Sequence, residues 1–153
     1  MHLLVSNYIV LADDDRDHGI LFEHVLRQVD PKKKLAIVPD GEQLLSLLNQ
    51  AQPEILFLDL KMPGKNGLEC LQEIRRQHEY DTMKIVVYSA STHMPDIQKC
   101  YLHNADLYMV KPFQTEHLIN ALHTVLQKDS WEMASLKNHY YINNRLVPFT
   151  AQI

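Results

Sequence analysis

The chain has 153 residues, a net charge of -4 and an apolar fraction of 46%, which together are typical of one ordinary globular domain. The mildly acidic charge disfavours non-specific binding to nucleic acid, and no apolar stretch approaches the roughly 20 residues that a membrane-spanning helix needs. The first residues carry no basic leader with a long apolar segment after it, so we expect a cytoplasmic protein that does not bind membranes.

Strand-like and helix-like segments alternate along the first part of the chain. Residues 8–12 are a short apolar run, typical of a strand covered on both faces, and residues 16–29 have apolar side chains at helical spacing. A second short strand at 35–38 precedes a leucine-rich helix. The third strand follows Pro53 and ends at Asp59.

The same alternation continues in the second part. A loop with Gly67 leads into a third helix and then a strand at 84–89. Pro95 suits the first turn of a fourth helix, in which we expect Tyr101 and Leu102 to face inward. A fifth strand at 107–110 and a last helix, with apolar residues at helical spacing after Thr115, complete the pattern.

Five strands alternating with five helices predict an α/β fold with a doubly wound parallel sheet, here over residues 6–128. Residues 129–153 break the alternation and are rich in aromatic side chains. Asp129 and Glu132 have the spacing of a capping box, which predicts a short helix in this C-terminal extension. We expect the aromatic tail to cover the domain's own surface; a dimer or partner contact is the alternative.

The ends of the predicted strands carry the residues with chemistry. Ligands of open parallel sheets bind at the carboxyl ends of the strands, which here end at Asp13-Asp14, Asp59, Ser89 and Lys111. Neighbouring carboxylates repel one another unless a cation joins them, and Mg²⁺ prefers such oxygen ligands. Asp59 is then a candidate nucleophile towards phosphorus, with the Lys111 ammonium and the Ser89 hydroxyl available to the phosphoryl oxygens.

Each of these signals is weak when taken singly. An aspartate run is usually a solvated turn, and an aspartate after an apolar run is more often a helix cap than a nucleophile. The nine histidines have no metal-ligand spacing and are expected at the surface, while Cys70 and Cys100 are expected as buried, reduced thiols. The joint occurrence of the four strand ends, in order, is what favours a functional site.

With these residues the chain resembles the receiver domains of two-component response regulators, and is similar to the single-domain regulators of chemotaxis. The resemblance covers residues 6–128 and rests on Asp13-Asp14, Asp59 to Pro63 with Gly67, Ser89-Ala90, and Lys111-Pro112-Phe113. It implies a flavodoxin-like sheet of five parallel strands in the order 2-1-3-4-5. It also implies a phosphoacceptor rather than an enzyme, modified by a histidine kinase or histidine phosphotransfer protein and acting on a downstream protein target.

The resemblance implies a role for each matching residue. Asp59 would accept the phosphoryl group. Asp14 and Asp59 would ligate Mg²⁺ directly, the backbone carbonyl of Lys61 would be a third ligand, and Asp13 would hold the ion mostly through water. Lys111 would pair with the phosphoryl group.

The switch implied by the resemblance uses Ser89 and Tyr108. Ser89 would move towards the phosphoryl group, and Tyr108 would turn inward behind it. The surface formed by the fourth helix, fifth strand and fifth helix would then change, and a homodimer through that surface is possible. The family often has Gly-Ala before the fifth strand where this chain has Asn104-Ala105, and asparagine tolerates the left-handed backbone of such a turn.

Three other functions compete with this interpretation. A phosphatase of the haloacid dehalogenase type needs an acid two residues after the nucleophile, where this chain has Lys61. A nucleotide- or flavin-binding protein needs a phosphate loop after the first strand, where this chain has three aspartates. A receiver-fold interaction module that signals without phosphorylation would keep all of the residues above.

Overall fold

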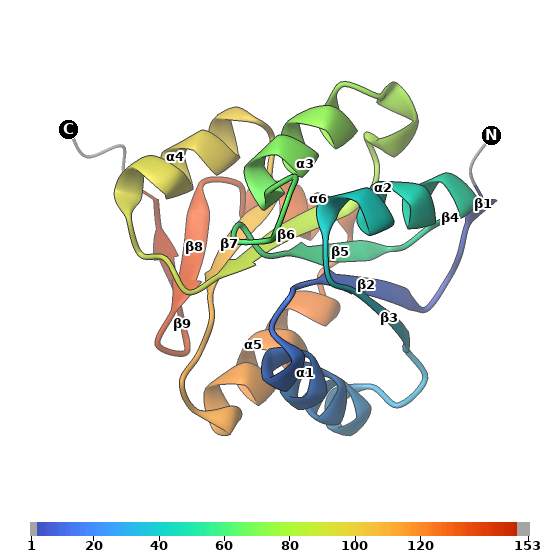
Figure 1. Ribbon diagram of the computed structural model, residues 1–153. Coiled ribbons are helices and arrows are strands. Elements are labelled where there is room, and N and C mark those ends of the chain that lie inside the picture. The colour runs from blue at the N-terminus through green and yellow to red at the C-terminus, as the bar shows by residue number, and fades with distance from the viewer. Residues whose placement is uncertain (1–2, 150–153) are drawn as a thin grey trace.

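The computed structural model describes residues 3–149; residues 1–2 and the last part of the predicted tail, residues 150–153, lie outside the described part. A twisted sheet forms the centre, with helices packed on both of its faces (Figure 1). Its strands, in spatial order, are β3 (Lys34–Val38), β2 (Tyr8–Ala12), β5 (Ile55–Leu58), β6 (Lys84–Ser89), β7 (Leu107–Val110), β8 (His139–Ile142) and β9 (Arg145–Pro148).

The first five of these strands are parallel and have the predicted order. They are short and almost wholly apolar because helices cover both faces, so alternation of polar and apolar residues is not needed. A separate two-stranded pairing joins β1 (Leu3–Leu4) to β4 (Ala51–Gln52).

Two helical layers cover the sheet. One layer contains α2 (Gly41–Gln50), α3 (Gly67–Arg75) and α4 (Met94–Leu102). A single 3-10 turn, η1 (His78–Tyr80), follows α3 in the chain. The other contains α1 (Arg16–Val29) and α5 (Thr115–Leu126), which lie on the opposite face in Figure 1. Each layer encloses its own cluster of buried apolar side chains.

Most predicted elements are confirmed, but one side chain faces the other way. Pro95 lies in the first turn of α4 and Tyr101 is buried, as expected, but Leu102 is 77% exposed, so the prediction that it faces inward is wrong. It ends the helix on the face turned away from the sheet. Asn104 has φ 67°, so asparagine does adopt the left-handed backbone expected of the turn before β7.

The sheet is larger than the five strands predicted. After α5 come a short helix, α6 (Ser130–Ser135), and the hairpin of β8 and β9. Strand β8 adds in parallel to β7, and β9 pairs with β8 in antiparallel fashion. The hairpin turn, Asn143-Asn144, has positive φ at both residues, which is the backbone that a tight two-residue turn requires.

The extension is packed against the sheet. Met133 and Tyr141 are 1% and 5% exposed and belong to the cluster on the α1–α5 face. Tyr140 and Phe149 pack against the cluster on the other face. Up to residue 149, the tail therefore covers the domain's own surface along the edge of β7, as expected.

Candidate functional site

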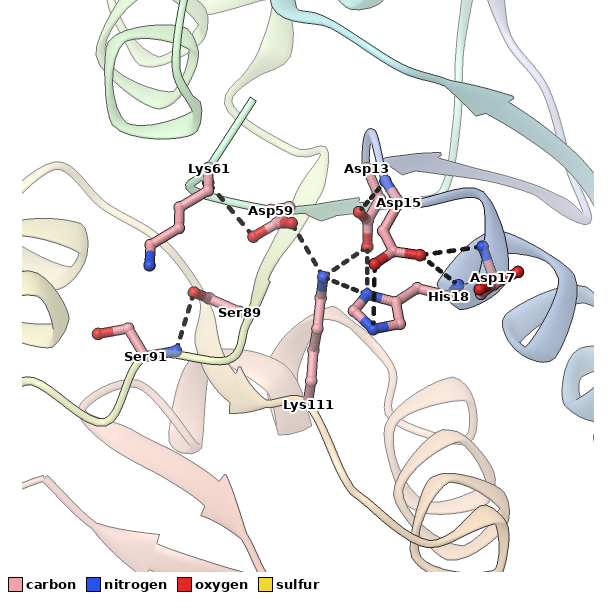
Figure 2. Close-up of polar contacts among 9 residues, drawn as sticks. All are labelled: Asp13, Asp15, Asp17, His18, Asp59, Lys61, Ser89, Ser91 and Lys111. Carbon is pink, nitrogen blue, oxygen red and sulfur yellow. Dashed lines mark hydrogen bonds and ion pairs between the residues drawn. The ribbon is translucent and has the colours of Figure 1, made fainter. Parts of the chain in front are cut away.

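The carboxyl ends of four parallel strands form one edge of the sheet, and the backbone ladder holds the residues that follow them. The Asp59 amide donates to the Ala12 carbonyl at 2.9 Å, and the Lys111 amide donates to the Ser89 carbonyl at 2.8 Å. Sheet hydrogen bonding thus continues one residue past β5 and past β7. It brings side chains separated by up to a hundred residues to a common place (Figure 2).

Gly67 allows the helix after β5 to start against the site. Its amide donates to the Leu60 carbonyl at 3.0 Å, and a Cβ added at Gly67 would lie 2.0 Å from the Asp59 carbonyl oxygen. No side chain fits there. The cap of α3, in which Asn66 and Glu69 bond to each other's backbone amides, fixes the helix start in this close approach.

The strand ends surround a cavity of about 670 Å³. Its lining includes Asp14, Asp59, Lys61, Ser89 and Lys111. Asp59 and Ser89 are 5% and 1% exposed, whereas Asp14 is exposed at the rim. The structure therefore brings these predicted site residues together, and Asp13 adjoins them beneath the cavity through its contact with Lys111.

Lys111 is the centre of the polar contacts. Its Nζ lies 2.9 Å from Asp59 Oδ2, 2.7 Å from Asp13 Oδ2 and 2.9 Å from His18 Nδ1. Burial by itself would lower the pKa of Lys111, but the hydrogen bonds and ion pairs with the two carboxylates outweigh it and raise the pKa. Lys111 is therefore a fixed positive charge at the floor of the cavity.

The carboxylates are the counterpart of that charge. Burial, followed by repulsion from Asp13, raises the pKa of Asp59, while Lys111 acts in the opposite direction. Oxygen atoms of Asp13, Asp14 and Asp59 all lie within 4.8 Å of one another. One ammonium group is shared by two of these three carboxylates, so the cluster has more acidic than basic groups.

Asp13 Oδ2 supports a cation site independently of the sequence motif. This atom is buried, and its contact with Lys111 Nζ at 2.7 Å leaves a lone pair that no other donor among the described residues takes up. The other oxygen, Oδ1, accepts from the Asp15 amide at 2.9 Å. Hard carboxylate oxygens with unused lone pairs are the donors that Mg²⁺ prefers, so the residues fit such an ion.

Asp15, the third aspartate of the run, has a structural role. It is the N-cap of α1, and its carboxylate accepts from the amides of Asp17 and His18 at 2.9 and 3.1 Å. The hydrogen bond from the His18 amide is the main reason that the pKa of Asp15 is lowered. This cap orients the first turn of α1 towards the cavity.

Sequence reasoning missed His18. It was expected at the surface with the other histidines, yet it lines the cavity and its Nδ1 lies 2.9 Å from Lys111 Nζ. Because a charged ammonium can only donate, Nδ1 must accept, which leaves the proton on Nε2, 3.5 Å from Asp15 Oδ2. Its position in the first turn of a helix that follows an acidic strand end was the available signal.

Ser89 and Tyr108 lie on the side of the cavity nearest α4. Ser89 Oγ accepts from the Ser91 amide at 3.2 Å, and the Tyr108 hydroxyl donates to the Ser91 carbonyl at 2.8 Å. Tyr108 is 0% exposed, and burial raises its pKa to about 12. Its ring thus occupies the inward position behind Ser89.

The backbone of Lys61 lies beside Asp59. Its amide donates to Asp59 Oδ1 at 3.3 Å, while its amine extends away from the carboxylate (Figure 2). Cys70 and Cys100 are buried and unpaired, as expected, and burial raises the pKa values of both thiols, to about 11 and about 12. They take no part in the site. In the part of the chain that the structure describes, no helix has the length and apolar character needed to cross a membrane.

Comparison with known proteins assigns the chain to a family of the same fold. The family described as the response regulator receiver domain matches residues 9–123. The chain is 33% identical over 114 residues to the transcriptional regulatory protein MalR of Bacillus subtilis, covering 74% of this chain and 48% of MalR. It is also 33% identical over 113 residues to the nitrate/nitrite response regulator protein NarL of Escherichia coli, covering 68% of this chain and 51% of NarL.

Solved structures agree with the fold. The Mn²⁺-bound form of response regulator Rcp1 matches with a TM-score of 0.72 and 24% identity, over 82% of this chain and 94% of that one. The chemotaxis response regulator CheY4 of Vibrio cholerae matches with a TM-score of 0.68 and 23% identity, over 82% and 99%. The chain spans about half the length of the curated relatives it matches. It belongs to the response regulator receiver family, whose members accept a phosphoryl group in two-component signalling.

Proposed function

We propose that this chain is a single-domain response regulator whose Asp59 accepts a phosphoryl group from a partner histidine kinase or histidine phosphotransfer protein in the presence of Mg²⁺. The observation that carries the proposal is the position of Lys111, whose ammonium contacts Asp59 at 2.9 Å and Asp13 at 2.7 Å at the floor of an open cavity. Residues 6–128 would be the receiver domain and 129–153 its extension, and the protein would act in the cytoplasm.

Magnesium would be held by Asp13, Asp14 and Asp59 together with the backbone carbonyl of Lys61. The close grouping of the three carboxylates and the unused lone pair of the buried Asp13 Oδ2 support this. When bound, the ion supplies positive charge that offsets the carboxylates and the incoming phosphoryl oxygens. We expect Asp14 and Asp59 to be direct ligands and Asp13 to act mostly through water.

The residues of the chain then perform the transfer. A carboxylate oxygen of Asp59 attacks phosphorus; the new O–P bond forms as the N–P bond of the donor phosphohistidine breaks, and the histidine nitrogen keeps the electron pair. Lys111 is placed to neutralise phosphoryl oxygens, since it already binds the acceptor. The Ser89 hydroxyl would donate to the same group.

The proposed output is a change of protein-binding surface. Ser89 and Tyr108 are connected through the short segment that ends at Ser91, so movement of Ser89 towards a phosphoryl group bears directly on the position of Tyr108. A downstream protein that prefers the altered face of α4, β7 and α5 would bind the phosphorylated form more tightly. A homodimer through this face is the alternative output, and it would have to form beside β8, which pairs with β7.

Labelling with acetyl phosphate and Mg²⁺ tests the proposal. We expect acid-labile phosphate on the wild-type chain and on Asp17→Asn, an exposed aspartate of α1 that serves as the matched control, and none on Asp59→Asn. Undiminished labelling of Asp59→Asn would contradict the assignment. If a partner bound wild type and Asp59→Asn equally well, the alternative of signalling without phosphorylation would be favoured.

A further inference from the structure

The C-terminal hairpin lies directly beside the proposed switch residue. In the register of β7 and β8, Tyr108 is paired with Tyr140 and Met109 with Tyr141. Side chains alternate between the faces of a sheet, and adjacent strands are about 4.8 Å apart. Tyr140 therefore lies next to Tyr108 on the face covered by α4, while Tyr141 belongs to the opposite face, as the two apolar clusters also indicate.

The position of β8 limits where the Tyr108 ring can move. Strand β7 has β6 on one side and β8 on the other. The Tyr108 hydroxyl reaches Ser91, which follows β6. A ring that turned away from Ser91 would have to move towards β8, and there it would meet Tyr140.

A second contact joins the extension to Tyr108 through α4. The hydroxyl of Tyr101 accepts from the backbone amide of Tyr108 at 2.9 Å, and Tyr101 is 6% exposed. The Tyr101 ring lies 5.2 Å from the ring of Phe149, which follows β9. The extension thus places Tyr140 beside Tyr108 in the sheet, and it is linked to the Tyr108 backbone through Phe149 and Tyr101.

We propose that the docked hairpin is a regulatory element that holds Tyr108 inward, with Tyr140 as the main positioning residue, so that hairpin docking and occupation of Asp59 by a phosphoryl group favour each other. This inference rests on the proposed function, because it assumes that the phosphoryl-bound form has Tyr108 inward. Linkage makes the effect reciprocal: docking strengthens binding of the phosphoryl group, and the bound group strengthens docking by the same factor.

Beryllofluoride, which stands in for a phosphoryl group, allows both directions to be measured on the full chain. Couplings between sites are commonly about fivefold or more in affinity. We expect Tyr140→Ala to weaken the binding of beryllofluoride with Mg²⁺ by at least about fivefold in calorimetric titration. Tyr140→Phe, which keeps the ring, should restore wild-type affinity.

Leu146→Ala is the matched control. Leu146 is a partly buried residue of the same hairpin that packs on the opposite face of the sheet, away from Tyr108. We expect its affinity for beryllofluoride to stay within about twofold of wild type, since the coupling would not pass through that face. Equal losses in Leu146→Ala and Tyr140→Ala, or no loss in Tyr140→Ala, would overturn the assignment to Tyr140.

The reciprocal measurement needs no substitution. Amide hydrogen exchange of β8 in the wild-type chain should slow when beryllofluoride and Mg²⁺ are added, because bound ligand stabilises the docked hairpin. Binding of beryllofluoride with unchanged exchange in β8 would overturn the coupling and leave the proposed function intact. Failure of the wild-type chain to bind beryllofluoride at all would overturn the proposed function and this inference together.

Discussion

At the scale of single residues, the charge balance around Lys111 determines how the site behaves. One ammonium lies between Asp13 and Asp59, and Asp14 adds a third carboxylate at the rim. The site has fewer basic groups than acidic ones. This imbalance affects the binding of metal ions and the pH dependence of the free energy of unfolding.

Magnesium should stabilise the folded chain through these carboxylates. A ligand that binds only the folded form at 100 times its Kd adds about 2.7 kcal/mol to the free energy of unfolding. We expect saturating Mg²⁺ to raise the Tm of wild type and of Asp17→Asn, and to leave Asp14→Asn nearly unchanged, as measured by differential scanning calorimetry. An equal Mg²⁺-dependent rise in Asp14→Asn would exclude that residue as a ligand.

The raised pKa of Asp59 predicts a pH dependence of stability without metal. The ordinary pKa of an unfolded aspartate is about 3.9, and burial places the folded value above it. The folded chain then binds the proton more strongly, so this contribution to stability is present below about pH 4 and is lost as the pH rises through the folded pKa.

Asp59→Asn remains neutral at every pH and lacks this dependence. In chelator, we expect the free energy of unfolding of wild type to fall relative to Asp59→Asn as the pH rises from about 4 to 7. Urea unfolding of both proteins across this range checks the sign. A wild type that gained stability over the variant with rising pH would show that Lys111 outweighs burial.

At the scale of secondary-structure elements, a buried guanidinium fixes α3 relative to the strands next to it. Arg75, at the end of α3, donates to the carbonyls of Tyr80, Met83 and Asn104 at 2.8 to 2.9 Å. It also donates to Asp106 Oδ2 at 2.9 Å. Its side chain is 9% exposed, so these bonds are shielded from water.

Removing that guanidinium should be costly. Arg75→Met leaves the partly buried Asp106 carboxylate without its cation, with the Ile85 amide as a remaining donor. Breaking a buried ion pair typically costs about 3–5 kcal/mol. The neighbouring Arg76 is exposed, so Arg76→Met should change the free energy of unfolding by less than about 0.5 kcal/mol. Urea unfolding at pH 7 compares them; similar values for the two variants would contradict the role given to Arg75.

The elements that position the site were readable from the sequence, but the hairpin was not. Runs such as Ile55–Leu58 are apolar throughout because both faces are covered, and that pattern is local. Strands β8 and β9 are four residues each; β8 joins a histidine and an isoleucine to two tyrosines, and β9 has Arg145 and Pro148 at its ends. The parallel partner of β8 is β7, which lies some thirty residues earlier, so no local pattern indicates the pairing.

At the scale of the whole molecule, the hairpin moves the exposed edge of the sheet from β7 to β9. Strand β9 carries Arg145 and Pro148, and a charged residue and a proline on an edge strand discourage pairing with another chain. The apolar strand β7 is protected from such pairing by β8. The extension therefore affects self-association as well as the switch.

We accordingly expect the chain to be monomeric at micromolar concentration, with or without beryllofluoride and Mg²⁺. Tyr141, which is 5% exposed, anchors the hairpin, so Tyr141→Asp should release it and expose β7, giving larger species. Tyr141→Phe, which keeps the ring, should behave as wild type. Multi-angle light scattering distinguishes these cases; a wild-type dimer would instead support association over the face of α4, β7 and α5.

The sequence by itself determined the five parallel strands and the positions of Asp13, Asp59, Ser89 and Lys111 at their ends. It could do so because burial on both faces leaves a continuous apolar run in each strand, and the polar residue at the end of each run is then easy to locate. Only the tertiary structure decided the contact of His18 with Lys111 and the pairing of Tyr140 beside Tyr108. Those depend on packing between distant segments, which leaves no periodic trace in the chain.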